Sequence, residues 1–172
     1  MALNRKSIII WSAALAILLL SCFITPGCPI FVHDRMLRQH CRKYRAVTHP
    51  TFTQRVKYYR ELGLLIGNGN HCDLFVGELR SYTGSQRQLL THYAAQSFWS
   101  PLQHRLPVDV FFIENGIITG GTIENEDISL CIPFTVERIL QDAKAFERSA
   151  DKLYIVYMFD YGYEPGLDIR CQ

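Results

Sequence analysis

Two runs of β-branched and aromatic residues lie either side of one Asn-Gly pair near the middle of the chain. Residues 108–114 precede Asn115 and Gly116, and residues 117–123 follow them. Asn and Gly both tolerate the positive φ values of a type I′ turn, so the pattern predicts a β-hairpin. We expect the Gly-Gly pair within the second run to form a bulge or a bend.

Apolar residues recur three and four positions apart in three further segments, which is the period of an amphipathic helix. The forms Thr51-x-x-Gln54 and Ser85-x-x-Gln88 are capping boxes that begin two of these helices. We expect helices over residues 51–62, from Ser85 until Pro101 stops the second, and over 135–149. Their predicted inward residues are Phe52, Val56, Tyr59 and Leu62; Leu89, Leu90, Tyr93, Ala94 and Ser97; and Val136, Ile139, Leu140, Ala143 and Phe146.

Two more segments resemble strands. Residues 72–80 are one, and residues 153–159 form a continuous apolar run, which is typical of a strand buried on both faces. With the hairpin and two helices they give the order β-α-β-β-α-β, the split β-α-β or ferredoxin-like arrangement. Its last strand would lie at a sheet edge, which residues 167–171 could cover as a short C-terminal strand. A meander in which residues 128–132 form their own strand is the alternative.

The predicted fold class is therefore α+β, in three parts. Residues 1–27 form a signal sequence or membrane anchor, residues 28–50 a basic connector, and residues 51–172 one globular domain whose extra N-terminal helix is 51–62. The anchor is indicated by a charged start and an apolar run over 7–24, at the short end of what spans a bilayer. Leu19, Leu20, Ser21 and Cys22 resemble the lipobox of bacterial lipoproteins, which implies lipid attachment at Cys22; an uncleaved transmembrane helix is the alternative.

Charge is distributed unevenly along the chain, although the net charge is only +2. Residues 1–60 contain ten Lys and Arg but one acidic residue, whereas residues 61–172 contain eight basic and fifteen acidic residues. The basic connector is where an anionic membrane surface would be met. Nucleic-acid binding is not expected, because the connector has no glycine-aromatic motif and the domain after it is acidic.

The six cysteines are dispersed, without a C-x-x-C pair or zinc-type spacing. Dispersed cysteines in a small domain indicate disulfides and an oxidising compartment. We therefore expect the domain to face the periplasm or the cell exterior. Basic residues after the apolar run favour the alternative, a cytoplasm-facing single-pass protein. In a ferredoxin-like sheet Cys72 and Cys131 would fall at the same end of adjacent strands, so their disulfide is predicted.

Candidate functional residues are few. His92 and Gln96 lie four apart on the polar side of a predicted helix, and Tyr161, Tyr163 and Asp168 surround a glycine turn that would make a rigid recognition surface. These five residues are the predicted binding residues. No metal or cofactor motif is present, and no catalytic set is assigned.

Two functions are compatible with these patterns. The first is a membrane-anchored, lipoprotein-like envelope protein whose domain binds a protein or another macromolecule without catalysis. The second is a small envelope hydrolase or transferase that uses His71 with Asp73, Asp160 or Asp168. Two of these carboxylates within hydrogen-bond reach of His71 would favour the enzyme.

Overall fold

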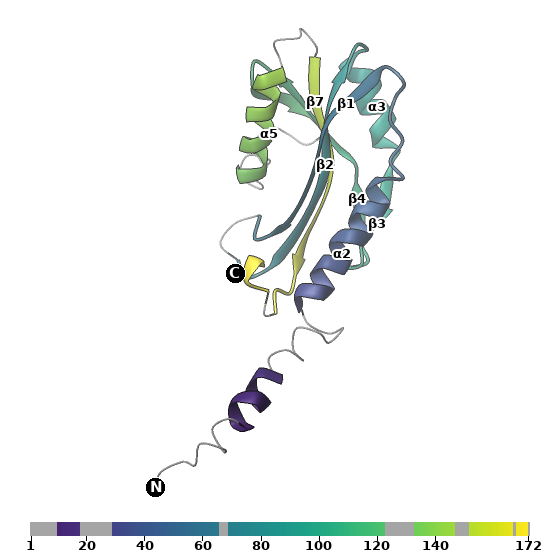
Figure 1. Ribbon diagram of the computed structural model, residues 1–172. Helices are drawn as coiled ribbons and strands as arrows, with labels where there is room; N and C mark the ends of the chain where they lie inside the picture. Colours follow the sequence, from purple (N-terminus) through teal and green to yellow (C-terminus); the bar gives the residue numbers. More distant parts are fainter. Residues whose placement is uncertain are drawn as a thin grey trace.

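The computed structural model describes residues 10–17, 29–65, 69–122, 133–146, 152–166 and 168–171. The fold is mixed α+β and is built on one five-stranded antiparallel sheet (Figure 1), which confirms the predicted class. Its elements are α2 (Pro29–Tyr44), β1 (Thr53–Gly63), β2 (Cys72–Tyr82), α3 (Gln86–Ala94), β3 (Ser97–Trp99), β4 (Arg105–Pro107), β5 (Asp109–Glu114), β6 (Ile117–Gly121), α5 (Pro133–Phe146), β7 (Lys152–Tyr163) and the 3-10 turn η2 (Ile169–Cys171). Residues 10–17 are also helical.

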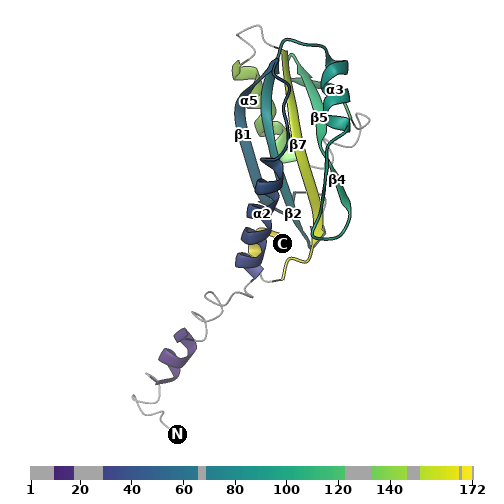
Figure 2. The ribbon, with the colours of Figure 1, turned by 90° about the vertical axis from the view of Figure 1, so that its right-hand side faces the viewer.

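The last strand in the sequence lies at the centre of the sheet. The order is β1-β2-β7-β5-β6, and each neighbouring pair is antiparallel. Along β7, Tyr163 is opposite Cys72 of β2, and Tyr157 is opposite Asp109 of β5. The hairpins β1-β2 and β5-β6 are therefore joined only through β7 (Figure 2).

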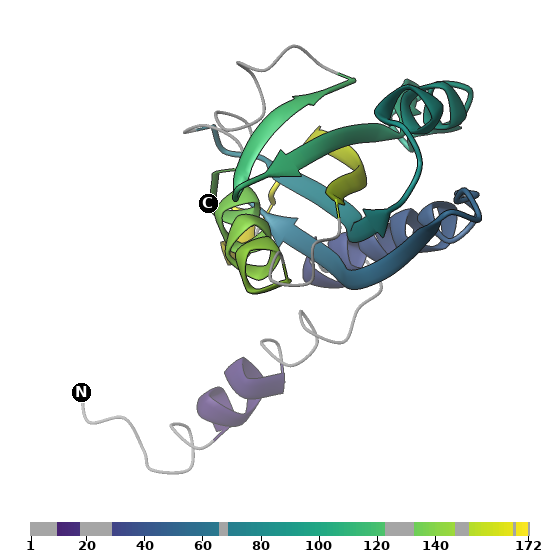
Figure 3. The same cartoon turned by 90° about the horizontal axis from the view of Figure 1, so that it is seen from above.

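Helices cover both faces of the sheet. The helices α2 and α3 lie on one face with the β3-β4 hairpin, and α5 lies on the other (Figures 1 and 3). Alternate residues of β7 face the two cores: Leu153, Ile155 and Tyr157 pack with α5, whereas Tyr154, Val156 and Met158 pack with α2 and α3. All six are buried, so the continuous apolar run is a strand buried on both faces, as predicted.

Three aromatic rings cross the sheet beneath α5. Tyr157 of β7 stacks on Phe75 of β2 and on Phe111 of β5, with 5.5 Å between ring centroids in both pairs. Gly77 is opposite Tyr157, where a Cβ atom would lie 2.7 Å from the Tyr157 Cβ and 3.2 Å from the Phe75 ring. The missing side chain at Gly77 therefore leaves the space in which the Phe75 ring meets Tyr157.

Side chains of α2 bind the backbone of the central strand. His40 Nε2 donates to the Met158 carbonyl at 3.2 Å, and the Tyr44 hydroxyl donates to the Val156 carbonyl at 3.0 Å. Because both donors are buried, these bonds satisfy groups that would otherwise lack a partner. They fix the angle at which α2 crosses the sheet.

The predicted Asn-Gly turn and the Ser85 cap are confirmed, but the capping box predicted at Thr51 is wrong because a strand follows it. Asn115 and Gly116 connect β5 to β6 with φ values of 53° and 69°, as a type I′ turn requires. A register shift opposite Phe112 makes Thr119 the extra residue of a bulge, immediately before the Gly-Gly pair. Ser85 caps α3 through a complete capping box with Gln88.

The helix ends differ from the predicted ones. The helix α3 ends at Ala94, so the predicted helical position Ser97 lies in β3 instead. In α5, Val136, Ile139 and Ala143 are buried as predicted, but Phe146 is 43% exposed.

The helix predicted over 51–62 is wrong, because this segment is strand β1. The register skips Val56, which is the extra residue of a β-bulge between Arg55 and Lys57. A bulge reverses the alternation of faces, so Val56 and Tyr59 both pack towards α5 although they are three residues apart. This spacing of three apolar positions in a strand therefore resembles the period of an amphipathic helix.

The predicted ferredoxin-like strand order is not found. In that order the strand 153–159 lies at an edge, whereas β7 is central and β1 takes the edge beside β2. A strand with two apolar faces and two apolar neighbours buries more surface at the centre than at an edge. The predicted C-terminal strand 167–171 is also wrong, since Ile169–Cys171 is a 3-10 turn. The alternative strand 128–132 lies outside the described residues.

The predicted disulfide between Cys72 and Cys131 is wrong, because Cys72 bonds to Cys171. The antiparallel pairing of β2 and β7 brings Tyr163 to Cys72, and the turn after Tyr163 keeps Cys171 at that end of the sheet. A fifth strand would have carried Cys171 away. Cys131 and the predicted lipid-attachment residue Cys22 lie outside the described residues.

No helix among the described residues is long and apolar enough to cross a membrane. Of the apolar run 7–24, the structure describes only the helical residues 10–17, in which Ile10, Trp11, Leu15 and Ile17 are exposed. The rest of the predicted signal or anchor lies outside the described residues.

The aromatic stack gives a test of the sheet. Gly77→Ala should lower the free energy of unfolding by about 1–3 kcal/mol, because its methyl group overlaps Tyr157 and displaces Phe75. Gly120→Ala is the matched control, since a Cβ atom there has no heavy atom within 4 Å. Urea unfolding measures both, and equal stability of the two variants would contradict the packing described.

The disulfide gives a second test. A peptide map without reduction should join Cys72 to Cys171. The bond closes a loop with a sequence separation of 99, for which the chain-entropy model gives about 4.7 kcal/mol. Cys171→Ser should therefore lower the urea midpoint strongly, and adding Cys72→Ser should change it little further. A map that joined Cys72 to Cys131 would instead support the disulfide predicted from the sequence.

Candidate functional site

A cavity opens between α2 and the β1-β2 edge of the sheet. Its volume is about 830 Å³, within the range of small-ligand sites, ~300–1,000 Å³. The end of α2, the connector after it, β1 and β2 all contribute to it. The lining residues are Tyr44, Arg45, Val47, His49, Arg55, Val56, Lys57, Tyr58, Glu78 and Arg80.

Two of the predicted binding residues position the connector beside this cavity. His92 Nε2 donates to the Thr48 carbonyl at 2.8 Å, and the Gln96 side chain bonds to both the carbonyl and the amide of Thr48. His92 of α3 and Gln96, which follows the end of this helix, thus bind their own chain. They hold His49, the next residue, against the sheet.

The inner wall of the cavity is a buried ion pair. Glu78 and Arg80 point to the same face of β2, and the Arg80 guanidinium donates to the Glu78 carboxylate. Arg80 also donates to the Thr53 hydroxyl at 3.0 Å. Glu78 has two further neighbours, Arg55 at 3.6 Å and His49 at 3.7 Å. A buried carboxylate with several cations around it is compensated.

His49 remains neutral in this setting. Burial and, after it, the positive charges of Arg80, His92 and Arg55 together lower the pKa of His49 to about 4. The neutral ring accepts a hydrogen bond at Nδ1 from the Tyr93 hydroxyl, 2.8 Å away. Tyr93 in turn shares a 3.0 Å hydrogen bond with Tyr154. Burial raises the pKa of both tyrosines, so the network stays protonated and uncharged.

The cavity is positively charged overall. Its lining contains Arg45, Arg55, Lys57 and Arg80 with one carboxylate, Glu78. Asp142 of α5 binds Lys57 at 2.7 Å and neutralises it, so the three arginines and Glu78 leave a balance of +2 with His49 neutral. Arg55 is 63% exposed and meets Glu78 only at 3.6 Å, so its guanidinium donors remain accessible. The lining side chains include no thiol and no aliphatic hydroxyl, so the arrangement suits the binding of an anion.

A second polar cluster surrounds Asp160, one of the predicted catalytic alternatives. The Ser100 hydroxyl donates to Asp160 Oδ2 at 2.7 Å, and Tyr163 donates to the same oxygen. His104 Nε2 lies 3.2 Å from Oδ1. Ser100 binds the carboxylate and not the histidine, so the three do not form a nucleophile and base. Tyr163, a predicted binding residue, is buried here.

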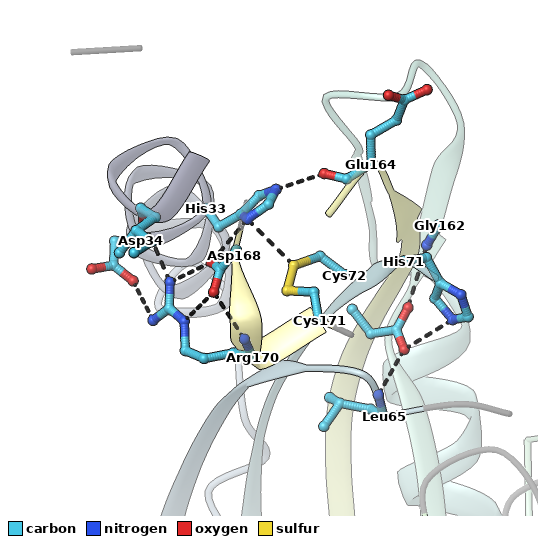
Figure 4. The surroundings of a disulfide bond; sticks show 12 residues. His33, Asp34, Leu65, His71, Cys72, Gly162, Glu164, Asp168, Arg170 and Cys171 are labelled. Carbon is cyan, nitrogen blue, oxygen red and sulfur yellow. Dashed lines mark hydrogen bonds and ion pairs between the residues drawn. A yellow bond between two sulfur atoms is a disulfide. The ribbon is translucent and has the colours of Figure 1, made fainter. Parts of the chain in front are cut away.

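A third cluster joins α2 to the C-terminal turn (Figure 4). His33 Nδ1 donates to Asp168 Oδ2 at 3.0 Å, and Arg170 binds both carboxylate oxygens. The Arg170 hydrogen bonds hold the pKa of Asp168 well below its usual range, and His33 contributes in the same direction. Arg170 also reaches Asp34 at 2.8 Å. Asp168, a predicted binding residue, is therefore buried in an internal network.

The predicted catalytic residues do not converge. His71 Nε2 lies 3.3 Å from Asp73, while the other two carboxylates have different histidines: Asp160 has His104 and Asp168 has His33. Asp73 is also fixed by the amides of Leu65 and Gly162. The hydrolase alternative required two carboxylates beside His71, and one is found there.

Of the predicted binding residues around the glycine turn, Tyr161 is exposed whereas Tyr163 and Asp168 are buried. Tyr161 is 59% exposed and stacks on Phe159 with 5.8 Å between ring centroids. One pair of residues in the sequence does indicate the cavity. Glu78 and Arg80 are opposite charges two apart in an apolar strand, so they share a face that is otherwise buried.

The lowered pKa of His49 predicts a pH dependence. Between pH 6.5 and about 4 the unfolded chain takes up a proton at this position and the folded chain does not. This contribution to stability is therefore complete above pH 6.5 and is lost as the pH falls towards 4. We expect urea midpoints measured at pH 7 and pH 4.5 to differ more in the wild type than in His49→Gln. Identical differences would contradict the buried neutral state.

Known proteins give no comparison for this geometry. Family models, curated proteins and solved structures show no significant match to the chain.

Proposed function

We propose that this chain is a non-catalytic binding domain that takes an anionic group of a macromolecular partner into the basic cavity. The supporting observation is the set of three arginines, Arg45, Arg55 and Arg80, around one carboxylate that is already paired. The anionic group that we propose is a carboxylate of an acidic protein segment. Arginine binds carboxylates through two parallel hydrogen bonds, which gives such a site both affinity and orientation.

The buried network supports a binding role because it makes the site rigid. Glu78, Arg80, Thr53 and His49 hold one another in fixed positions below the cavity. The exposed Arg55 and Arg45 at its opening then meet a ligand without rearrangement of the layer below. A preformed site loses less conformational entropy on binding than a mobile one.

We further propose that residues 1–27 hold the domain at a bacterial cell envelope, facing the periplasm or the cell exterior. The Cys72–Cys171 disulfide supports an oxidising compartment. In this arrangement the basic segment 28–50, which includes α2, would follow the anchor directly. The partner would then be another protein of the envelope.

The cavity can be tested with two peptides of equal length, one of glutamates and one of glutamines. The full-length chain in detergent should bind the glutamate peptide more tightly, and added salt should weaken this binding. Arg55→Gln and Arg45→Gln should each weaken it by about tenfold, the loss of ~1.4 kcal/mol. Fluorescence anisotropy of a labelled peptide measures the dissociation constants.

Arg105→Gln is the matched control, since Arg105 is an exposed residue of β4 that does not line the cavity. It should leave the affinity unchanged. The proposal is wrong if both peptides bind equally, or if the cavity variants bind the glutamate peptide as the wild type does.

A further inference from the structure

Four metal-ligating side chains meet at the C-terminal end of β7 (Figure 4). They are His33 of α2, Cys72 at the start of β2, and Asp168 and Cys171 of the C-terminal turn. One ligand atom from each lies within 4.8 Å of all the others, and all four residues are buried. Three segments far apart in the sequence thus bring nitrogen, oxygen and sulfur donors to one point.

The direction of the lone pairs is the second observation. His33 Nε2 donates to the Glu164 carbonyl at 2.9 Å, which leaves Nδ1 to face the other ligands. Nδ1 lies 3.0 Å from Asp168 Oδ2 and 3.3 Å from Cys72 Sγ. These separations are close to those between ligand atoms that share one metal ion.

The surroundings are those of a metal site. A metal-bound histidine commonly donates its second ring nitrogen to a backbone carbonyl, which fixes the tautomer and the ring, and Glu164 does this for His33. A bound carboxylate is usually hydrogen-bonded in turn, and Arg170 holds Asp168 Oδ1 through its side chain at 2.8 Å and its amide at 3.1 Å. Arg170 also donates to Oδ2 at 2.6 Å, the oxygen that lies beside His33.

We propose that reduction of the Cys72–Cys171 disulfide converts this cluster into a tetrahedral zinc site, with His33, Cys72, Asp168 and Cys171 as its ligands. Two thiolates, one imidazole and one carboxylate are all ligands of zinc, and four is its usual coordination number in structural sites. Thiolates on one zinc ion lie about 3.8 Å apart, given Zn–S bonds of ~2.3 Å. The two sulfur atoms reach this separation by side-chain rotation once their bond is broken.

The exchange between the two states requires a dithiol reductant. The dithiol loses two S–H protons and two electrons as its own disulfide forms, the Cys72–Cys171 bond breaks, and each sulfur gains one proton. Zinc then replaces the two thiol protons, which pass to solvent. The disulfide and the metal site are therefore alternatives, one for oxidising and one for reducing surroundings. Neither depends on the basic cavity.

Cobalt(II) is a suitable probe because sulfur ligation gives it a charge-transfer absorption. The full-length chain with Cys22, Cys28 and Cys131 replaced by Ser is reduced with dithiothreitol and desalted without oxygen. We expect it to bind one equivalent of cobalt with sulfur charge transfer and tetrahedral d–d bands, and zinc to displace the cobalt. The oxidised chain should show neither absorption.

Removing a ligand should have a larger effect than the roughly 10–100-fold loss that outer-shell changes cause. Cys171→Ser and His33→Gln should weaken cobalt binding by at least ~100-fold. Two matched controls should bind as the parent does: Cys41→Ser removes a buried free cysteine of α2, and His71→Gln removes a histidine that also lies beside a buried aspartate.

If reduction unfolds the chain, circular dichroism can still test the site, because it measures whether zinc restores the fold. Recovery of the folded spectrum on addition of one equivalent of zinc supports the site. The proposal is overturned if zinc does not restore the fold, if the folded reduced chain shows no sulfur charge transfer, or if Cys171→Ser binds cobalt as tightly as the parent.

Discussion

Burial of β7 on both faces is the constraint on which the rest of this fold depends. Its residues alternate between two apolar cores. The strand β2 pairs with it from Lys152 to Tyr163, and β5 pairs with it from Leu153 to Tyr157. Without β7 the hairpins β1-β2 and β5-β6 have no common partner. The positions of α2 and α5 also follow from it, because each helix covers one of its faces.

The helix α2 links this strand to the polar features of the molecule. His33 binds the C-terminal turn, His40 and Tyr44 bind carbonyl groups of β7, and the end of the helix opens into the basic cavity. Polar side chains inside a protein require partners, so these contacts restrict α2 to one depth and one rotation on the sheet. The cluster at the disulfide and the cavity therefore lie at opposite ends of one rigid helix.

Much of the local structure could be predicted from the sequence, because its causes are local. The Asn115-Gly116 turn, the Ser85 cap and the apolar run of β7 each depend on residues adjacent in the chain. The predictions that were wrong concern features that depend on contacts between distant parts of the chain. The bulge at Val56 gives strand β1 an apolar spacing like that of a helix. The strand order depends on which strand buries most apolar surface at the centre of the sheet, and this cannot be read from any one short segment. The pairing of Cys72 followed from that order, and so did the cavity, whose lining comes from both β1 and β2.

The place of β7 has a consequence for how the chain folds. The strands β2 and β5 each have one edge of unpaired backbone groups until residues 152–163 are available to lie between them. Pairing between such distant segments closes long loops, which slows folding and raises the contact order. During that delay the two open edges can pair with other chains. A newly made chain would therefore need protection from aggregation until its last strand is inserted, and a chaperone that covers strand edges would serve it best.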